Sequence, residues 1–198
     1  PQAGLYNYMF DEDLTSLYPS IIMTVNIGKE TLVARIIDTD DRNNRLGLND
    51  LKAKDPEEEL LIENNKRVRT KIKVKELLLF IESQNWAISA NGVMFKTDRR
   101  SVLATILDKW FDERVEYKNA MKKAYKAGEN ELGASFHMKQ YTMKILLNSL
   151  YGATALGSFR YGNVILSEAI TLSGQRIIQE SALCANRHMN KIIRNEIK

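Results

Sequence analysis

An aspartate followed by a short turn opens the most informative chemical pattern in the sequence, Asp13-Leu-Thr-Ser-Leu-Tyr-Pro-Ser20. A carboxylate at the end of a strand can hold Mg²⁺, a hard cation that takes oxygen ligands and shares them with substrate phosphates. The turn after it can direct successive backbone N–H groups at those phosphates, and the ring of Tyr18 can pack against a sugar. A lone aspartate before a turn is more often a helix cap or a solvated group. The specific run from Ser16 to Ser20 nevertheless favours a nucleotide site.

A second pattern, Lys144-Ile-Leu-Leu-Asn-Ser-Leu-Tyr-Gly152, has the spacing of a helix. Lys144, Asn148 and Tyr151 are separated by four and then three residues, so an ammonium, an amide and a phenol share one face. Taken alone, this segment fits equally well an amphipathic helix with an ordinary polar face.

A third pattern, Arg114-Val-Glu-Tyr-Lys118, places two cations four residues apart on an earlier helix. A guanidinium and an ammonium together can hold a triphosphate. If the two helices form an antiparallel hairpin, Lys144 lies beside this pair, and all of these cations converge on one anion. Without the other two patterns, an ordinary basic surface would be the simpler explanation.

The three patterns together resemble a known family. Residues 13–22 resemble the first catalytic motif of family B DNA polymerases, D-x-x-S-L-Y-P-S-I, and residues 144–152 resemble their fingers motif, K-x-x-x-N-S-x-Y-G. Residues 114–118 are similar to the family's R-x-x-x-K on the other fingers helix, and the details are most similar to polymerases of tailed phages. The resemblance implies an α+β fold, with a partial palm of β-strands and packed helices and a projecting antiparallel two-helix fingers hairpin.

The resemblance also implies roles for the residues of the first motif. Asp13 would be one of two metal-bridging carboxylates, and the carbonyl of Leu14 would be a further metal ligand. The backbone amides of Ser16, Leu17 and Tyr18 would bind the β- and γ-phosphates. The ring of Tyr18 would lie under the deoxyribose and reject a 2′-hydroxyl.

On the fingers, the resemblance implies that Arg114, Lys118 and Lys144 neutralise the triphosphate and that Lys144 protonates the leaving pyrophosphate. Asn148 would lie near the triphosphate, and Tyr151 near the nascent base pair. The implied reaction is in-line attack of a primer 3′-hydroxyl on the α-phosphate of a dNTP, with two Mg²⁺ ions about 3.5–4 Å apart. The fingers would close when the nucleotide binds. The implied partners are dNTP and primer–template DNA.

One motif of that family, the Y-x-D-T-D-S hairpin with the second catalytic aspartate, is absent from the sequence. The nearest match, Asp38-Thr-Asp40, precedes the fingers and lacks the flanking tyrosine and serine. Because one carboxylate motif holds two Mg²⁺ ions poorly, we expect no meaningful polymerase activity from this chain alone. The remaining polymerase segments, namely the second aspartate motif, the thumb and the exonuclease, are then expected in the same parent chain or in a second subunit.

Two other function classes stay open from the residues. One is a non-catalytic nucleic-acid-binding module, or a split subunit, that has retained the polymerase fold. The other is a general polyanion-binding helical protein, which would show no preference for a triphosphate over sulfate or heparin.

The elements that must position these residues follow from periodicity. The segments 101–127 and 134–151 predict an antiparallel helical hairpin, with Gly128 as the stop of the first helix. At ~1.5 Å per residue the first helix would be roughly 40 Å long, which indicates a projecting arm. The other expected elements are strands at 5–13 and 31–37, helices near 56–66 and at 73–83, a hairpin at 86–95 and a helix at 166–195.

Local signals add detail to these elements. Pro19 is expected to interrupt regular secondary structure, because proline neither donates to a strand ladder nor fits a helix interior. Asn91-Gly92 suits the positive φ values of a type I′ turn. The buried side of the last helix is expected to consist of Leu166, Ile170, Leu172, Ile177, Ile178, Leu183, Met189 and Ile192.

These elements divide the chain into three expected parts. Residues 1–100 form the N-terminal part of the palm with an insertion, and residues 101–152 form the fingers hairpin. Residues 153–198 form a palm helix segment that ends before the second aspartate motif.

The bulk composition is that of an ordinary globular protein, with 198 residues, 44% hydrophobic, 27% charged and a net charge of +4. No apolar run approaches the ~18–20 residues of a membrane span, so no membrane partner is expected. The one cysteine, Cys184, excludes an intramolecular disulfide and a cysteine-based zinc site, and it is expected to be a small buried hydrophobe. The expected location is the cytoplasm of a phage-infected cell or an equivalent intracellular replication site.

Overall fold

The computed structural model describes residues 14–37 and 46–196, so Asp13, the predicted strand at 5–13 and Asp38-Thr-Asp40 lie outside the described residues. Along the described chain the elements are α1 (Leu17–Val25), β1 (Leu32–Ile36), α2 (Leu48–Lys52), β2 (Glu59–Asn64), β3 (Arg69–Lys73), α3 (Val74–Ser83), β4 (Ala87–Ile88), β5 (Val93–Phe95), α4 (Val102–Lys126), α5 (Asn130–Thr154) and α6 (Val164–Glu196).

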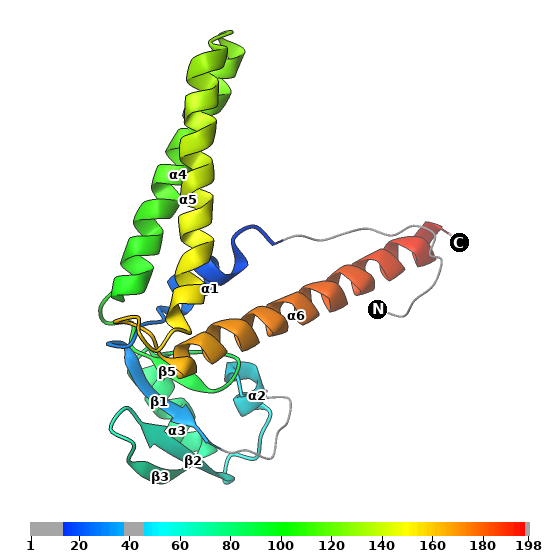
Figure 1. Ribbon diagram of the computed structural model, residues 1–198. Coiled ribbons are helices and arrows are strands. Elements are labelled where there is room, and N and C mark those ends of the chain that lie inside the picture. The colour runs from blue at the N-terminus through cyan, green and yellow to red at the C-terminus, as the bar shows by residue number, and fades with distance from the viewer. Residues whose placement is uncertain (1–13, 38–45, 197–198) are drawn as a thin grey trace.

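The described elements form an α+β fold, as the resemblance implies. Five antiparallel strands make one sheet in the order β3-β2-β1-β5-β4. The helices α4 and α5 lie side by side and project away from the sheet as one arm, while α6 leaves the sheet in a different direction (Figure 1). The helix α1 lies at the base of the arm, where it contacts α4, α5 and α6.

The helix α1 begins before Pro19 and continues through it, so the prediction that this proline interrupts regular secondary structure is wrong. Leu17 is the first helical residue and Ser16 precedes it in the left-handed region, with φ 56° and ψ 43°. Pro19 is therefore the third residue of the helix, where a backbone N–H has no intrahelical partner to lose. The sharp turn expected after Asp13 is present at Thr15-Ser16.

Residues 59–73 form a β-hairpin, and the prediction of a helix near 56–66 is wrong. Leu60 lies opposite Ile72 across the strand pair, and Leu60 is fully buried. Most side chains on the other face are charged, and Glu63 pairs directly with Arg69. Because so many of these residues are charged, the alternation of side chains between the two faces of the strands is hard to recognise in the sequence. Pairs of side chains across the two strands stabilise the hairpin, and a helix would not form these pairs.

The hairpin predicted at Asn91-Gly92 is confirmed, but its turn is not of type I′. Gly92 has φ 76°, whereas Asn91 is not among the residues with positive φ. The N–H of Gly92 donates to the carbonyl of Ser89 at 3.0 Å, and the N–H of Ser89 donates to the carbonyl of Val93 at 2.9 Å. This is a three-residue loop in which a tight turn is followed by a left-handed residue.

The two long helices are confirmed as an antiparallel hairpin. The Ser101 hydroxyl caps α4 by accepting the N–H of Ala104 at 3.0 Å, and Gly128 follows its end with φ 80°. The helix α5 is longer than predicted, and both Gly133 and Gly152 lie inside it. At Gly133 an added Cβ would stand 2.7 Å from the ring of Tyr125 on α4, so this glycine permits close packing of the two helices.

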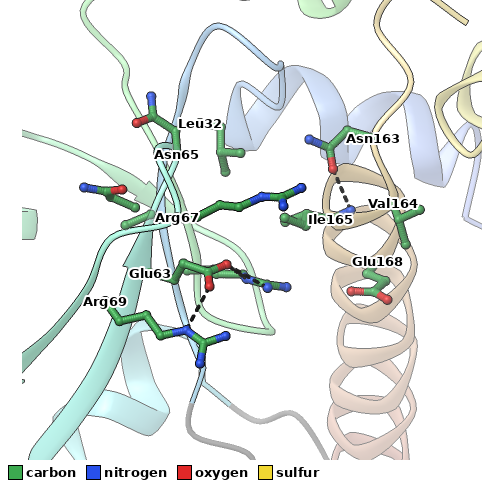
Figure 2. Close-up of a pocket in the computed structure, with 12 residues that line it drawn as sticks. Leu32, Glu63, Asn65, Arg67, Arg69, Asn163, Val164, Ile165 and Glu168 are labelled. Carbon is green, nitrogen blue, oxygen red and sulfur yellow. Dashed lines mark hydrogen bonds and ion pairs between the residues drawn. The ribbon is translucent and has the colours of Figure 1, made fainter. Parts of the chain in front are cut away.

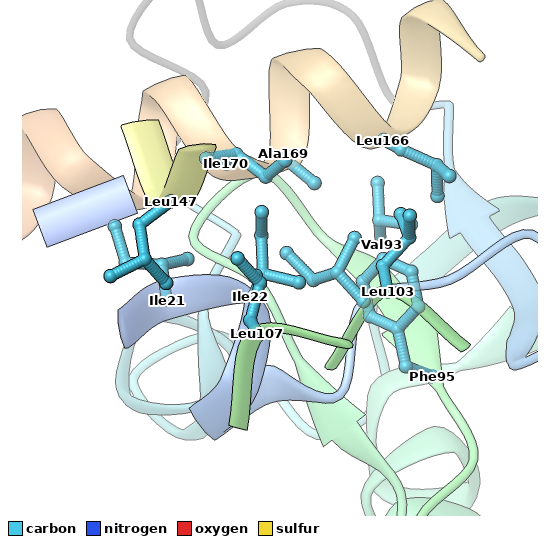
Figure 3. Close-up of a cluster of buried hydrophobic side chains, with 11 residues drawn as sticks. Ile21, Ile22, Val93, Phe95, Leu103, Leu107, Leu147, Leu166, Ala169 and Ile170 are labelled. Carbon is cyan, nitrogen blue, oxygen red and sulfur yellow. The ribbon is translucent and has the colours of Figure 1, made fainter. Parts of the chain in front are cut away.

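Two clusters of buried side chains hold the fold together. The root cluster joins α1, β5 and the beginning of α6 to the base of the arm (Figure 3). In it Ile22, Leu107, Leu147 and Ile170 are fully buried, so residues from four helices share one core. The sheet cluster lies between the sheet and the helices α2 and α3, and includes Leu51, Leu60, Leu77 and Met94.

The apolar stripe of α6 is buried only in its first turns. Leu166 and Ile170 belong to the root cluster, but Ile178 and Leu183 are 52% and 48% exposed, so the prediction for the second half is wrong. Cys184 is also exposed, contrary to expectation. A stripe in the sequence shows that one face is apolar, but it does not show which element covers that face. None of the described helices combines the length and the apolar character that crossing a membrane requires.

Candidate functional site

The turn before α1 is held by a guanidinium from the arm. Arg114 on α4 donates from Nη1 to the hydroxyl of Ser16 at 3.2 Å. Its Nε is buried and has no hydrogen-bond partner among the described residues. A buried donor without an acceptor costs free energy, so it marks a position where a further acceptor would be stabilised.

Two tyrosines stack beside this turn. The ring centroids of Tyr18 on α1 and Tyr151 on α5 are 4.3 Å apart, with an interplanar angle of 26°. The phenol oxygen of Tyr151 lies 2.8 Å from the hydroxyl of Thr171 on α6. Since the Thr171 hydroxyl donates its proton to the carbonyl of Ser167 at 2.9 Å, Tyr151 is the donor in this pair.

A glycine of α6 contacts the ring of Tyr18. A Cβ added at Gly174 would stand 3.0 Å from the Tyr18 Cε1 and 3.5 Å from side-chain atoms of Leu17 and Ile21. This distance is tighter than ordinary van der Waals contact, so the absent Cβ sets how close the Tyr18 ring lies to α6. The helix α6 therefore positions both tyrosine rings.

A buried asparagine fixes α1 against the start of the arm. Asn26 follows α1 in the left-handed region with φ 60°, and it is 4% exposed. Its Nδ2 donates to the carbonyls of Lys96 and Arg99 at 2.7 and 2.8 Å, and its Oδ1 accepts the N–H of Ser101 at 2.8 Å. Because Ser101 is the cap of α4, these bonds set the position of Arg114 relative to the turn.

The remaining predicted residues stand at the surface of the arm. Lys118, Lys144 and Asn148 are exposed, and none makes a hydrogen bond or ion pair within the described part of the chain. Lys118 lies one turn beyond Arg114 on α4, while Lys144 and Asn148 lie on the α5 face that continues to Tyr151. The structure thus joins Arg114 to Ser16 and Tyr18 to Tyr151, and gives no contact from Lys118, Lys144 or Asn148 to the turn.

The proposed metal ligands are only in part described. Leu14 is half-buried directly before the turn, whereas Asp13 lies outside the described residues. Within residues 14–37 and 46–196, no group of three or more His, Cys, Asp and Glu side chains is placed to hold a metal ion. A carboxylate and a backbone carbonyl are oxygen donors, which is the ligand type that Mg²⁺ takes.

Sequence reasoning did not find the residues that position this site. Asn26, Thr171 and Gly174 were absent from the predictions. Gly174 carried a usable signal, because a glycine inside an otherwise helical segment often has a packing reason. Asn26 and Thr171 had no signal of this kind, since their partners are set by tertiary contacts.

Comparison with known families shows which family the chain belongs to. The family model for DNA polymerase family B matches residues 1–198. The chain therefore belongs to DNA polymerase family B.

Several relatives share this assignment. The chain is 28% identical over 246 residues to the DNA-directed DNA polymerase of Escherichia phage RB69, covering 99% of this chain and 24% of that protein. It is 26% identical to the DNA-directed DNA polymerase of Enterobacteria phage T4, covering 97% of this chain and 23% of that protein. The chain thus spans about a quarter of the length of these relatives.

A solved structure shares the fold. The family B DNA polymerase of the archaeon Pyrobaculum calidifontis superposes with a TM-score of 0.57 at 16% identity, covering 88% of this chain and 17% of that one. This likeness supports the fold.

Proposed function

We propose that this chain is the nucleotide-binding part of a DNA-directed DNA polymerase. It binds an incoming dNTP with Mg²⁺ and presents it to the primer 3′-hydroxyl on template DNA. In this proposal residues 1–100 and 153–198 belong to the palm, and residues 101–152 are the fingers. The observation that carries the proposal is Arg114, whose buried Nε has no acceptor among the described residues while its Nη1 contacts the turn of Ser16.

The turn and the arm together supply the donors for a triphosphate. The backbone N–H groups of Ser16, Leu17 and Tyr18 are at the start of α1, where no intrahelical acceptor is available to them. A helix N-terminus favours negative charge, so these groups suit the β- and γ-phosphates. Arg114 adds a charged donor that is already oriented at this turn.

The exposed cations of the arm complete the proposed triphosphate site. Lys118, Lys144 and Asn148 have no partners within the described residues, so their side chains are free to reach an anion that enters beside α1. A small inward rotation of the arm about its root would bring them to the triphosphate. Lys144 would then hold the proton that passes to the leaving pyrophosphate.

Metal ions would lower the barrier to phosphoryl transfer by stabilising the charge on the attacking and leaving oxygens. The Asp13 carboxylate and the Leu14 carbonyl are the groups of this chain that would hold them. The second catalytic carboxylate would come from the remaining polymerase segments, in the same parent chain or in a second subunit.

Complementation tests this proposal. This chain is mixed with a partner that carries the Asp-Thr-Asp hairpin and the thumb, and primer extension on a DNA template is measured. We expect neither chain to extend the primer alone, the mixture to extend it, and Asp13→Ala to abolish the extension. The matched control is Asp55→Ala, which removes an exposed carboxylate between α2 and β2, outside the proposed site, and should leave extension unchanged. Binding without synthesis, under pairings in which both chains are folded, would favour a non-catalytic module.

The Tyr18 ring is proposed to select the sugar, and Gly174 sets its position. In Gly174→Ala the added methyl displaces the ring from its stack with Tyr151. We expect the preference for dNTP over NTP in binding to fall by about tenfold, which corresponds to ~1.4 kcal/mol. The free energy of unfolding should change little. Alanine is more favourable than glycine in a helix by about 1 kcal/mol, and this gain offsets the steric cost of the added methyl group against Tyr18. An unchanged dNTP preference would contradict this role of Gly174.

A further inference from the structure

A polar cavity lies away from the turn of Ser16. It has a volume of about 560 Å³ and lies between β1, the β2–β3 hairpin and the start of α6 (Figure 2). We call it the arginine cleft, because Arg35, Arg67 and Arg69 all line it. No residue of the proposed dNTP site takes part in its lining.

A buried carboxylate orients two of these arginines. The Oε1 of Glu63 accepts from Arg35 Nε and Nη2 at 3.1 and 2.8 Å, and its Oε2 accepts from Arg69 Nε at 3.1 Å. The two guanidinium groups lower the pKa of Glu63, so this carboxylate stays charged and holds both groups in place. Arg69 keeps both terminal nitrogens without a partner among the described residues, and its side chain is 62% exposed.

The side chain of the third arginine has no partner in the described part of the chain. The guanidinium of Arg67 makes no hydrogen bond and no ion pair there. Figure 2 shows its side chain extended across the cleft toward Ile165 at the start of α6. An unpaired guanidinium that spans a cleft is available to an anion from outside.

Arginine is also an unfavourable residue type for the backbone conformation at position 67. The N–H of Arg67 donates to the carbonyl of Asn64 at 2.9 Å, and the N–H of Asn64 donates to the carbonyl of Val68 at 3.0 Å. This is the same loop as in the β4–β5 hairpin, where the corresponding left-handed position is Gly92. Arg67 has φ 62°, a conformation that costs free energy for a residue with a side chain. Here the chain has an arginine where glycine would fit the backbone better.

The opposite wall is formed by the start of α6. Val164 and Ile165 give it an apolar surface beside the polar groups of Asn163 and Glu168. The Oδ1 of Asn163 accepts the N–H of Ile165 at 2.9 Å, which leaves its Nδ2 as a donor. The lining therefore has three guanidinium groups and two carboxylates, and one carboxylate, Glu63, is paired with two of the guanidinium groups. The remaining wall is apolar.

We propose that the arginine cleft binds one nucleotide of a single-stranded DNA segment. The phosphodiester would be held by Arg67 and the free nitrogens of Arg69, while the base or sugar lies on Val164 and Ile165. Arginine matches phosphate through its planar fork and stacks on bases. A cavity of about 560 Å³ holds a ligand of nucleotide size, whereas a duplex is too wide to enter it.

The position of the cleft relates it to the proposed dNTP site. Ile165 and Thr171, which bonds Tyr151, are six residues apart on α6, or roughly 9 Å along its axis. This is roughly two to three nucleotide steps of a strand at 3.4 Å each. The inference rests on the proposed function only for the choice of DNA as the polyanion.

Two variants that remove the same charge test the proposal. Binding of a fluorescein-labelled oligothymidylate to the intact chain is measured by anisotropy over a series of salt concentrations. We expect Arg67→Gly to weaken binding at least tenfold at low salt and to reduce the log–log salt slope by about 1. Lys66→Ala, one residue away and outside the cleft, should change affinity less than threefold. The melting temperature of Arg67→Gly should stay the same or rise, because glycine suits the left-handed backbone, so a loss of binding cannot be assigned to unfolding.

Three results would overturn the inference. The first is equal affinity of Arg67→Gly and Lys66→Ala for the oligonucleotide. The second is displacement of the oligonucleotide by inorganic phosphate at an equal concentration of phosphate groups, which would make this a site for a free anion. The third is stronger binding of a duplex than of the single strand in an Arg67-dependent manner.

A separate variant keeps this inference distinct from the proposed function. Lys144→Ala should lose dNTP affinity and retain Arg67-dependent binding of the oligonucleotide. A chain with Arg67-dependent oligonucleotide binding but no measurable dNTP binding would refute the proposed dNTP site and leave the arginine cleft. The reverse pattern would refute the cleft alone.

Discussion

Arg114→Ala is expected to weaken binding of the Mg²⁺–dNTP complex by roughly 10- to 150-fold, or about 1.5–3 kcal/mol. The substitution removes a charged donor that the fold holds against the turn through Ser16. It also removes the buried Nε that has no acceptor among the described residues. The measurement is calorimetric titration of the chain with dATP and Mg²⁺.

The stability of Arg114→Ala separates binding from folding. The Ser16 contact is lost, but so is the cost of a buried donor without a partner, so the free energy of unfolding should change little. Lys122→Ala removes an exposed cation two turns further along α4 and should leave dNTP affinity unchanged. Wild-type affinity of Arg114→Ala, in a folded chain, would show that this guanidinium does not bind the nucleotide.

Leu147→Ala is expected to lower the free energy of unfolding by about 2–5 kcal/mol. Leu147 is fully buried in the root cluster with Leu107 and Ile170, where a truncated side chain leaves a cavity between α5, α4 and α6. Urea unfolding followed by circular dichroism measures the change. Since this core fixes the arm to α1 and α6, dNTP affinity should fall as well.

The adjacent residue provides the control for this change. Leu146 is 37% exposed and lies outside both buried clusters, so Leu146→Ala should cost less than about 1 kcal/mol. Equal costs for the two substitutions would mean that the root cluster is not the core that holds the arm.

The long helices could be predicted because their signals are local. The stop at Gly128 and the apolar period of α4 are both readable within one segment. The hairpin at 59–73 could not be read in this way. Its charged side chains pair across strands, as Glu63 does with Arg69, and such pairing is visible only when the two strands are aligned.

Part of the candidate site could be predicted from the sequence through its resemblance to a known family. Ser16, Tyr18, Arg114 and Tyr151 were named through the resemblance, and the structure brings them together in two contacts. The role of Asp13 stays a prediction, because that residue lies outside the described part of the chain.

The residues that hold the site in place depend on contacts between distant segments. Asn26 is the example: its three hydrogen bonds reach residues 96, 99 and 101, and no spacing within the sequence connects them. Resemblance to a motif therefore names the residues that touch a ligand, but it does not name the residues that position them.

The two buried clusters differ in how much of the chain each one needs, and this has a consequence for synthesis on the ribosome. The sheet cluster draws on Ala34 to Met94, a continuous stretch that is complete before the arm has been made. The root cluster brings Ile21 together with Ile170, which stand near opposite ends of the chain. Contacts between such distant segments form late, so the apolar side of α1 would stay exposed to solvent until α6 has been synthesised. Chaperones that bind nascent chains would then bind this helix.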